Sequence, residues 1–191
     1  SAMFGAYAAL LALGVLEQVA VDLAHGDRQR LLLQARLDQG ADVLEDAVDA
    51  VNLPYNNLAG ALPASLDQLT QLTRIDMAGN RLTGPLPAGL SGMTALRYVD
   101  LDTNLISGTI PSLGALVHLE NFNLYDNRVT GTVPSLTGLT ALRTFDVSRN
   151  ALTGNVPDLA GLDLLYFFVG YNKLTGTPPA APATLLFGGL C

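Results

Sequence analysis

Carboxylates and aromatic rings are the side chains through which this chain could do chemistry, and they recur at a nearly constant spacing. The acidic set is Asp76, Asp100, Asp102, Asp126 and Asp146. The aromatic set is Tyr98, Tyr125, Tyr166, Phe168 and Tyr171. Aromatic rings give a surface large apolar contacts, and carboxylates attract basic or hydrogen-bond-donating groups. The combination favours contact with a protein or peptide, or stacking against a sugar ring.

The residues that enzymes use most often form no recognisable catalytic set. The two histidines, His25 and His118, are far apart in the sequence, and Cys191 is the single cysteine, so neither an HExxH motif nor paired metal-binding cysteines occur. The glycines form no phosphate-binding loop, and no serine stands in a nucleophile elbow. We therefore expect a protein that is not an enzyme and that uses no metal and no cofactor.

A sequence motif of eleven residues that contains a recurring asparagine occurs six times and sets the spacing of these side chains. Its asparagines are Asn56, Asn80, Asn104, Asn127, Asn150 and Asn172, at intervals of 24, 24, 23, 23 and 22 residues. Apolar residues stand eight, five and three positions before each asparagine, a glycine stands four positions after it and a proline seven. The last two apolar residues are two apart, as on one side of a short strand. Strands that arrive in one direction must pair in parallel through a crossover, so the period predicts a solenoid.

The recurring asparagines are expected to be structural rather than ligand-binding. A sharp turn after each strand leaves backbone amides and carbonyls inside the coil, and buried backbone groups need partners. An asparagine side chain offers two donors and an acceptor, so a stack of them can serve the turns of neighbouring coils. We expect Asn127, in the middle of the stack, to contribute more stability than Asn172, because coils on both sides would depend on it.

The repeat follows the pattern LxxLxLxxNxLxGxIP, which residues 96–111, LRYVDLDTNLISGTIP, match at nearly every fixed position. This pattern resembles the plant-type class of leucine-rich repeat (LRR) proteins over residues 48–179. The resemblance implies an α/β fold: a right-handed leucine-rich-repeat solenoid with a parallel concave β-sheet, convex coils that are irregular or briefly helical, and an α-helical N-terminal cap. We expect five or six sheet strands of three to five residues each.

The segments outside the six repeats are expected to close the ends of the solenoid. Residues 1–3 look like a scar left by tag cleavage plus a start codon. Residues 4–47 are expected to form the helical N-terminal cap, and residues 180–191 an incomplete C-terminal cap. Residues 4–24 are apolar around much of a helix, so we expect them to pack over the first repeat or to form a homodimer with a second copy. Residues 4–16 could instead be a retained targeting segment, and they are shorter than the roughly 20 apolar residues that span a bilayer.

Charge and composition limit the classes of partner that this chain could bind and the cellular locations in which it could work. The net charge of −7 and the pI of about 4.5 disfavour nucleic acid, whose phosphates need a basic surface. The caps of the family usually carry a cysteine pair and a tryptophan, whereas this chain has no tryptophan and one cysteine. It also has no Asn-x-Ser/Thr glycosylation site. These absences favour a bacterial or microbial protein that uses the repeat, although the family resemblance favours a secreted or cell-surface location; an intracellular location stays open.

The resemblance implies a binding role, usually for proteins, peptides or glycans. We expect this role on the concave face, where equivalent residues of successive repeats form columns. Residues six, four and two positions before each asparagine should project from that face. The residues predicted to bind a protein or peptide partner are Tyr98, Asp100, Asp102, Tyr125, Asp146, Tyr166, Phe168 and Tyr171.

Two alternatives to this reading stay open. The chain could be the recognition half of a larger receptor or effector whose enzymatic module lies outside it. A minor alternative is an ice-binding or glycan-binding solenoid, because a ladder of small hydroxyl residues follows the asparagines. Its members are Thr83, Ser107, Thr109, Thr130, Thr132, Thr153, Thr175 and Thr177.

Overall fold

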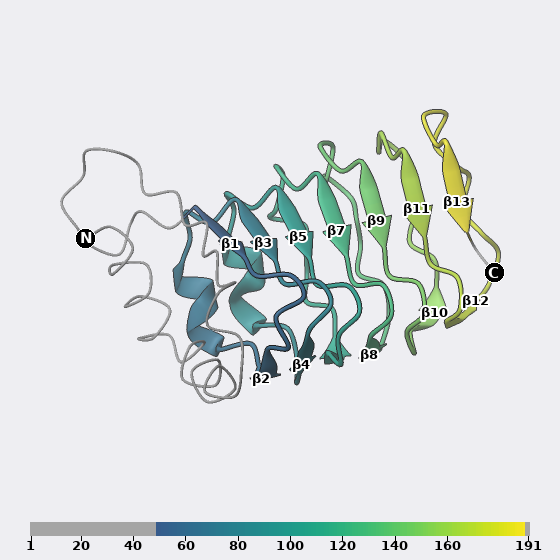
Figure 1. Ribbon diagram of the computed structural model, residues 1–191. Helices are drawn as coiled ribbons and strands as arrows, with labels where there is room; N and C mark the ends of the chain where they lie inside the picture. The colour runs from purple at the N-terminus through teal and green to yellow at the C-terminus, as the bar shows by residue number, and fades with distance from the viewer. Residues whose placement is uncertain (1–48, 190–191) are drawn as a thin grey trace, which may run out of the picture.

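The computed structural model describes residues 49–189 as coils stacked along one axis (Figure 1). The expected helical cap at residues 4–47 lies outside the described residues. Within residues 49–189 the helices are two short 3-10 helices, η2 (Ala64–Gln68) and η3 (Ala88–Gly92). This part of the chain is therefore a β-solenoid, as the period predicts.

One three-residue strand from each coil enters a seven-stranded parallel sheet. The strands, in the same order along the chain and across the sheet, are β1 (Ala50–Asn52), β3 (Arg74–Asp76), β5 (Tyr98–Asp100), β7 (Asn121–Asn123), β9 (Thr144–Asp146), β11 (Tyr166–Phe168) and β13 (Phe187–Gly189). The register pairs equivalent residues of neighbouring coils, for example Val99 with Phe122. Equivalent residues therefore stand in columns that cross the sheet.

The sheet has one strand more than the five or six that the sequence predicts. The additional strand, β13, lies in the segment expected to be an incomplete C-terminal cap, and it pairs Gly188 with Phe167 of β11. The apolar sequence pattern of β13 is weak, because a glycine occupies the middle position of the strand, where the other coils have Val, Ile or Phe. Leu185, one period after Leu164, packs against the core and was the available signal for this coil.

A second set of short parallel strands follows the asparagines, on the other side of the coils from the sheet (Figure 1). The pairs are β2 (Ala59–Ala61) with β4 (Arg81–Thr83), β6 (Ser107–Thr109) with β8 (Arg128–Thr130), and β10 (Thr153–Asn155) with β12 (Lys173–Thr175). The N–H after each asparagine from Asn80 to Asn172 donates to a carbonyl of the preceding coil, as from Leu105 to Leu82 at 2.8 Å. This side is more regular than the sequence indicates, because stacked coils bring their backbones within hydrogen-bonding distance here too.

The apolar residues of the repeat fill the space between these two sets of strands. The middle residue of each of the first six sheet strands is buried: Val51, Ile75, Val99, Phe122, Phe145 and Phe167. The three phenylalanines stack, with ring centroids 5.6 Å apart between Phe122 and Phe145 and 5.7 Å apart between Phe145 and Phe167. The buried residues form one cluster from the first described coil to Val169. A continuous core therefore supports the sheet over its length.

The glycine four positions after each asparagine is required both by conformation and by space. Its φ angle lies between 73° and 94° in all six copies, a region that favours glycine. It also lies against the preceding coil: a Cβ on Gly131 would come within 2.8 Å of Thr109 Cγ2. The repeat glycine thus sets how closely neighbouring coils approach.

Five of the six asparagines join their own coil to the preceding one in the same way. The Oδ1 of Asn127 accepts a hydrogen bond from the N–H of Ile106 at 2.9 Å, and its Nδ2 donates to Leu101 of the preceding coil and to Leu124 and Tyr125 of its own. The others that follow this pattern are Asn80, Asn104, Asn150 and Asn172. The Asn56 side chain, in the first described coil, donates to Pro54 within that coil.

The hydrogen bonds of the asparagines therefore run in one direction along the stack. Asn172 makes the same set of bonds as Asn127, to its own and the preceding coil. The expectation that the side chain of a central asparagine serves coils on both sides is therefore wrong, and these hydrogen bonds give no reason for Asn127 to contribute more stability than Asn172. Counting only partners within residues 49–189, Asn56 at the opposite end has the smaller set.

Candidate functional site

Each of the first six sheet strands turns its first and third residues outward, because its middle residue belongs to the core. With the residue two positions after the strand, they form three columns, which we call the sheet face. The columns are Ala50, Arg74, Tyr98, Asn121, Thr144 and Tyr166; then Asn52, Asp76, Asp100, Asn123, Asp146 and Phe168; then Pro54, Ala78, Asp102, Tyr125, Ser148 and Gly170. All the predicted binding residues lie in these columns except Tyr171, which follows the last column by one residue.

The second column has a backbone role that the sequence analysis did not assign. Side-chain oxygens of Asp100, Asn123 and Asp146 accept a hydrogen bond from the N–H two residues later, at 3.2, 3.0 and 2.9 Å. This Asx turn holds the chain where it leaves the strand. The recurrence of Asp or Asn in one column was the signal that could have revealed it. One carboxylate oxygen of Asp100 and of Asp146 is therefore already engaged within the fold.

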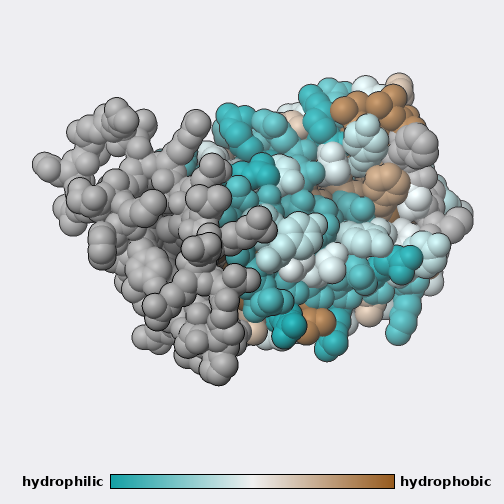
Figure 2. Space-filling view, viewed as in Figure 1, coloured by the Kyte–Doolittle hydropathy of each residue, from teal (hydrophilic) through white to brown (hydrophobic). Residues whose placement is uncertain are grey.

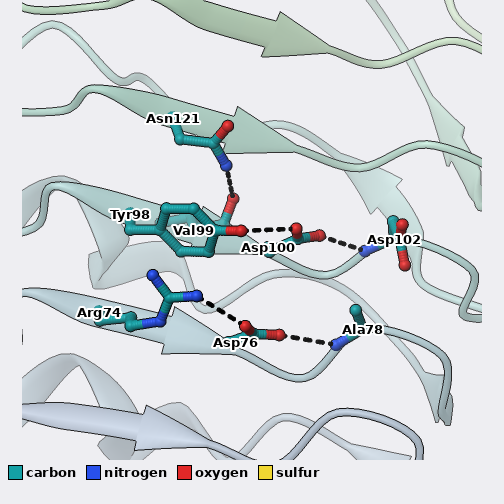
Figure 3. Close-up of polar contacts among 8 residues, drawn as sticks. All are labelled: Arg74, Asp76, Ala78, Tyr98, Val99, Asp100, Asp102 and Asn121. Atoms are coloured by element: carbon teal, nitrogen blue, oxygen red, sulfur yellow. Dashed lines mark hydrogen bonds and ion pairs between the residues drawn. The ribbon is translucent and has the colours of Figure 1, made fainter.

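The polar side chains on β3 and β5 pair with one another (Figure 3). Arg74 Nη2 lies 2.8 Å from Asp76 Oδ2, and the Tyr98 hydroxyl donates to Asp100 Oδ2 at 3.0 Å. The Arg74 guanidinium also lies 3.6 Å from the centroid of the Tyr98 ring. Burial, followed by the Asp100 carboxylate, raises the pKa of Tyr98, which keeps its hydroxyl a hydrogen-bond donor. These four residues largely satisfy one another.

Asp102 lies beside these residues, and its carboxylate charge is less well compensated by hydrogen bonds and ion pairs than those of Asp76 and Asp100 (Figure 3). Its Oδ1 is buried and has no hydrogen-bond partner within residues 49–189. Burial raises the pKa of Asp102, and the carboxylates of Asp100, Asp76 and Asp146 raise it further. Carboxylates that repel one another are stabilised when a cation approaches the solvent-accessible side of the group. This part of the sheet face is therefore chemically suited to a cationic group.

Aromatic side chains gather on the C-terminal part of the sheet face. The Tyr166 and Phe168 rings, on β11, lie 6.5 Å apart with an interplanar angle of 18°. The Arg149 guanidinium lies 5.0 Å from the centroid of the Tyr171 ring and 5.9 Å from that of Tyr125. Tyr171 is 71% exposed and Tyr166 is 39% exposed. Figure 2 shows the described surface as mostly hydrophilic, with hydrophobic residues most evident toward its C-terminal end.

The structure thus brings the predicted binding residues together in two groups rather than one. The acidic end consists of Tyr98, Asp100 and Asp102, with Arg74 and Asp76. The aromatic end consists of Tyr125, Tyr166, Phe168 and Tyr171, with Arg149. Asp146, on β9 between them, accepts a hydrogen bond from Ser148 Oγ at 2.5 Å. Arg74 and Arg149 were not among the residues predicted to bind a partner, although Arg74 falls in the first column and Arg149 directly precedes an asparagine.

The threonine ladder, considered for ice binding, has hydroxyl groups that join coils. Thr130 Oγ1 donates to the carbonyl of Gly108 and Thr153 Oγ1 to that of Gly131, both at 3.1 Å. Thr175 makes the equivalent bond to Gly154 at 3.5 Å. These hydroxyls therefore have a structural use that does not involve a ligand.

No group of three or more His, Cys, Asp or Glu side chains in residues 49–189 is placed to hold a metal ion. Across this described part of the chain, no helix is long and apolar enough to cross a bilayer.

Comparisons with known proteins agree with the repeat pattern. The family model described as Leucine Rich Repeat matches residues 71–93. The plant peptide hormone receptor RGFR1, solved in complex with RGF2, is 34% identical with a TM-score of 0.67, over 69% of this chain and 22% of that chain. The chain is a plant-type leucine-rich repeat protein. Among curated protein sequences, no match to this leucine-rich repeat protein was found.

Two further plant structures resemble this leucine-rich repeat protein. The LRR ectodomain of the receptor kinase GASSHO1/SCHENGEN3 from Arabidopsis thaliana, in complex with CASPARIAN STRIP INTEGRITY FACTOR 2, is 32% identical with a TM-score of 0.67, over 69% of this chain and 16% of that chain. Pollen Receptor Kinase 3 is 29% identical with a TM-score of 0.63, over 69% of this chain and 66% of that chain. The matched region spans about a fifth of the length of RGFR1 and less of GASSHO1/SCHENGEN3.

Proposed function

We propose that this leucine-rich repeat protein is a non-catalytic recognition module that binds a protein or peptide on its sheet face, the concave side of the solenoid. The observation that carries the proposal is the aromatic end, where Tyr166, on strand β11, and Tyr171, in the turn after it, remain 39% and 71% exposed. The likeness to RGFR1, a plant peptide hormone receptor solved with RGF2, supports the same class of partner. By the likeness to receptor ectodomains we also propose a secreted or cell-surface location.

The physical case rests on rigidity and on the residue types. Side chains anchored on adjacent hydrogen-bonded strands lose little conformational entropy when a partner binds. Aromatic residues supply most of the contact free energy in many interfaces. The carboxylates on the same face raise the association rate of a basic partner. Phe168 and Tyr166 lie on β11, and Tyr125 follows β7, which is two strands away in the same sheet.

The test is a selection of random peptides displayed on phage, with the purified chain as the immobilised target. Selected peptides are synthesised, and their Kd values are measured for the wild type and for the double variant Tyr125→Ala with Phe168→Ala. We expect the double variant to bind at least about 30-fold more weakly, which corresponds to roughly 2 kcal/mol. Its circular dichroism and melting temperature should stay near those of the wild type, because both side chains lie outside the core.

A matched control replaces two exposed threonines on the other side of the coils, Thr109→Ala with Thr132→Ala. These changes should leave the Kd values unchanged. Peptides that bind the aromatic double variant as well as the wild type, and that lose affinity for the threonine variant, would move the site away from the sheet face and contradict the proposal.

A further inference from the structure

We propose that the partner of the sheet face is an extended peptide with a lysine or arginine about four residues away from an aromatic or large aliphatic residue. The cation lies at the acidic end and the apolar side chain at the aromatic end. This inference rests on the proposed function and adds the chemistry and spacing of the partner.

The acidic end selects a cation because its own positive charge is already engaged. Arg74 pairs with Asp76 at 2.8 Å and stacks on the Tyr98 ring at 3.6 Å. Asp102 has a buried Oδ1 without a partner in the described residues, with the carboxylates of Asp100 and Asp76 close enough to act on it. A guanidinium or ammonium group that approaches the solvent-accessible side of these carboxylates offsets the repulsion between them.

The aromatic end selects an apolar side chain for the opposite reason. Arg149 already lies within 5.0 Å and 5.9 Å of the Tyr171 and Tyr125 ring centroids, so a second cation there would be repelled. The paired Tyr166 and Phe168 rings present a flat, partly exposed surface. Such a surface matches another ring or a branched aliphatic group.

The spacing between the two contacts follows from the sheet. From β5, which carries Tyr98 and Asp100, to β11, which carries Tyr166 and Phe168, the sheet advances by three strands. Neighbouring strands lie about 4.8 Å apart, which places the two ends about 14 Å from each other. An extended peptide advances about 3.3 Å per residue, so it covers this distance in about four residues.

The experiment selects from a library of displayed nine-residue random peptides on three targets: the wild type, Asp100→Asn with Asp102→Asn, and Tyr166→Ala with Phe168→Ala. Asparagine at position 100 keeps the side-chain oxygen that accepts the N–H of residue 102, as Asn123 does for Tyr125. On the wild type, peptides with a basic residue three to five positions from an aromatic or aliphatic residue should be enriched at least tenfold over the starting library. The acidic-end variant should lose the preference for the basic residue and keep the apolar one, and the aromatic-end variant should do the reverse.

The outcomes separate this inference from the proposed function. Selected peptides that depend on Tyr166 and Phe168 but show no basic residue at that spacing would overturn the inference and leave the proposed function standing. No enrichment on the wild type, or enrichment that neither variant alters, would overturn both. As a second readout, the Kd of a selected peptide should rise at least fivefold between 50 and 300 mM salt on the wild type, and by less on the acidic-end variant.

Discussion

Asn127 and its counterparts show how one side chain can satisfy the backbone of two coils. Its Oδ1 holds the N–H of Ile106, and its Nδ2 is shared among three carbonyls. An aspartate could not replace it, because an ionised carboxylate only accepts hydrogen bonds. The second column of the sheet face differs in this respect, since both Asp and Asn occur there and only an acceptor is needed.

Replacing Asn127 by alanine should lower the free energy of unfolding by roughly 1–3 kcal/mol, the cost of leaving buried backbone groups unpaired. Asn172→Ala should cost about as much, because it loses an equivalent set of hydrogen bonds. Urea denaturation followed by circular dichroism measures both, and a cost for Asn172→Ala much smaller than that for Asn127→Ala would contradict the one-directional ladder.

Asp102 provides a prediction about pH at the same scale. Its pKa is raised above the usual value of 3.8, so the folded protein holds this proton more tightly than the unfolded chain does. The charged form therefore lowers stability at pH values above the folded-state pKa, and this penalty disappears as pH falls through that pKa toward 3.8. Asp102→Asn should raise the urea midpoint at pH 7, with a gain that shrinks as the pH approaches the usual value.

The control for this pH series is Asp158→Asn, at an exposed position where the side-chain oxygen that accepts the N–H of Ala160 is retained. It should change the midpoint little at any pH. A gain for Asp102→Asn that stayed constant between pH 3 and pH 8 would show that its charge is not the cause.

At the scale of the element, each turn after a sheet strand includes a residue with positive φ directly before the asparagine. Non-glycine residues occupy this position in five coils: Tyr55, Thr103, Asp126, Arg149 and Tyr171, with φ between 49° and 57°. Side chains disfavour this conformation, so the surrounding hydrogen bonds must impose it. The residue types at this position vary, which is why the sequence did not reveal the shared backbone shape.

The glycine of the repeat supplies a test of how closely coils approach. Gly131 and Gly138 have φ angles of 80° and 88°, so alanine at either position carries a similar backbone cost of about 1–2 kcal/mol. A Cβ on Gly131 would meet Thr109 Cγ2 at 2.8 Å, whereas a Cβ on Gly138 would have nothing within 4 Å. Gly131→Ala should therefore destabilise more than Gly138→Ala, by about 1 kcal/mol or more in urea denaturation.

A rescue variant identifies the contact responsible. Thr109→Ser removes the methyl group that the new Cβ would meet, so Gly131→Ala should cost less in that background. Equal costs for the two glycine variants, or no rescue by serine, would show that conformation alone requires the glycine.

At the scale of the whole molecule, each coil contacts its neighbours, so stability depends on how the two ends are closed. The strand β13 continues the sheet by one coil beyond the six repeats that carry the asparagine motif. The hypothesis that residues 4–24 pack over the first repeat, or against a second copy of the chain, concerns residues outside the described range and stays a prediction.

Limited proteolysis followed by mass spectrometry can test that hypothesis. Removal of the N-terminal segment should lower the melting temperature if it covers the first repeat, or halve the mass in solution if it joins two copies. Both properties can be measured on the trimmed protein by calorimetry and by light scattering. A trimmed protein with the melting temperature and the oligomeric state of the whole chain would rule out both roles.

The spacing of the asparagines, leucines and glycines by itself determined the parallel solenoid, the buried column and the residues that face outward. This was possible because alternation along a strand and a constant coil length are properties of the chain itself. Only the tertiary structure decided the direction of the asparagine bonds, the Asx turns of Asp100 and Asp146, the coil ending in β13, and the division of the sheet face into an acidic and an aromatic end. These features depend on contacts between side chains and backbone of neighbouring coils, such as Arg149 with Tyr125 and Tyr171, and on rotamers that the repeat period does not specify.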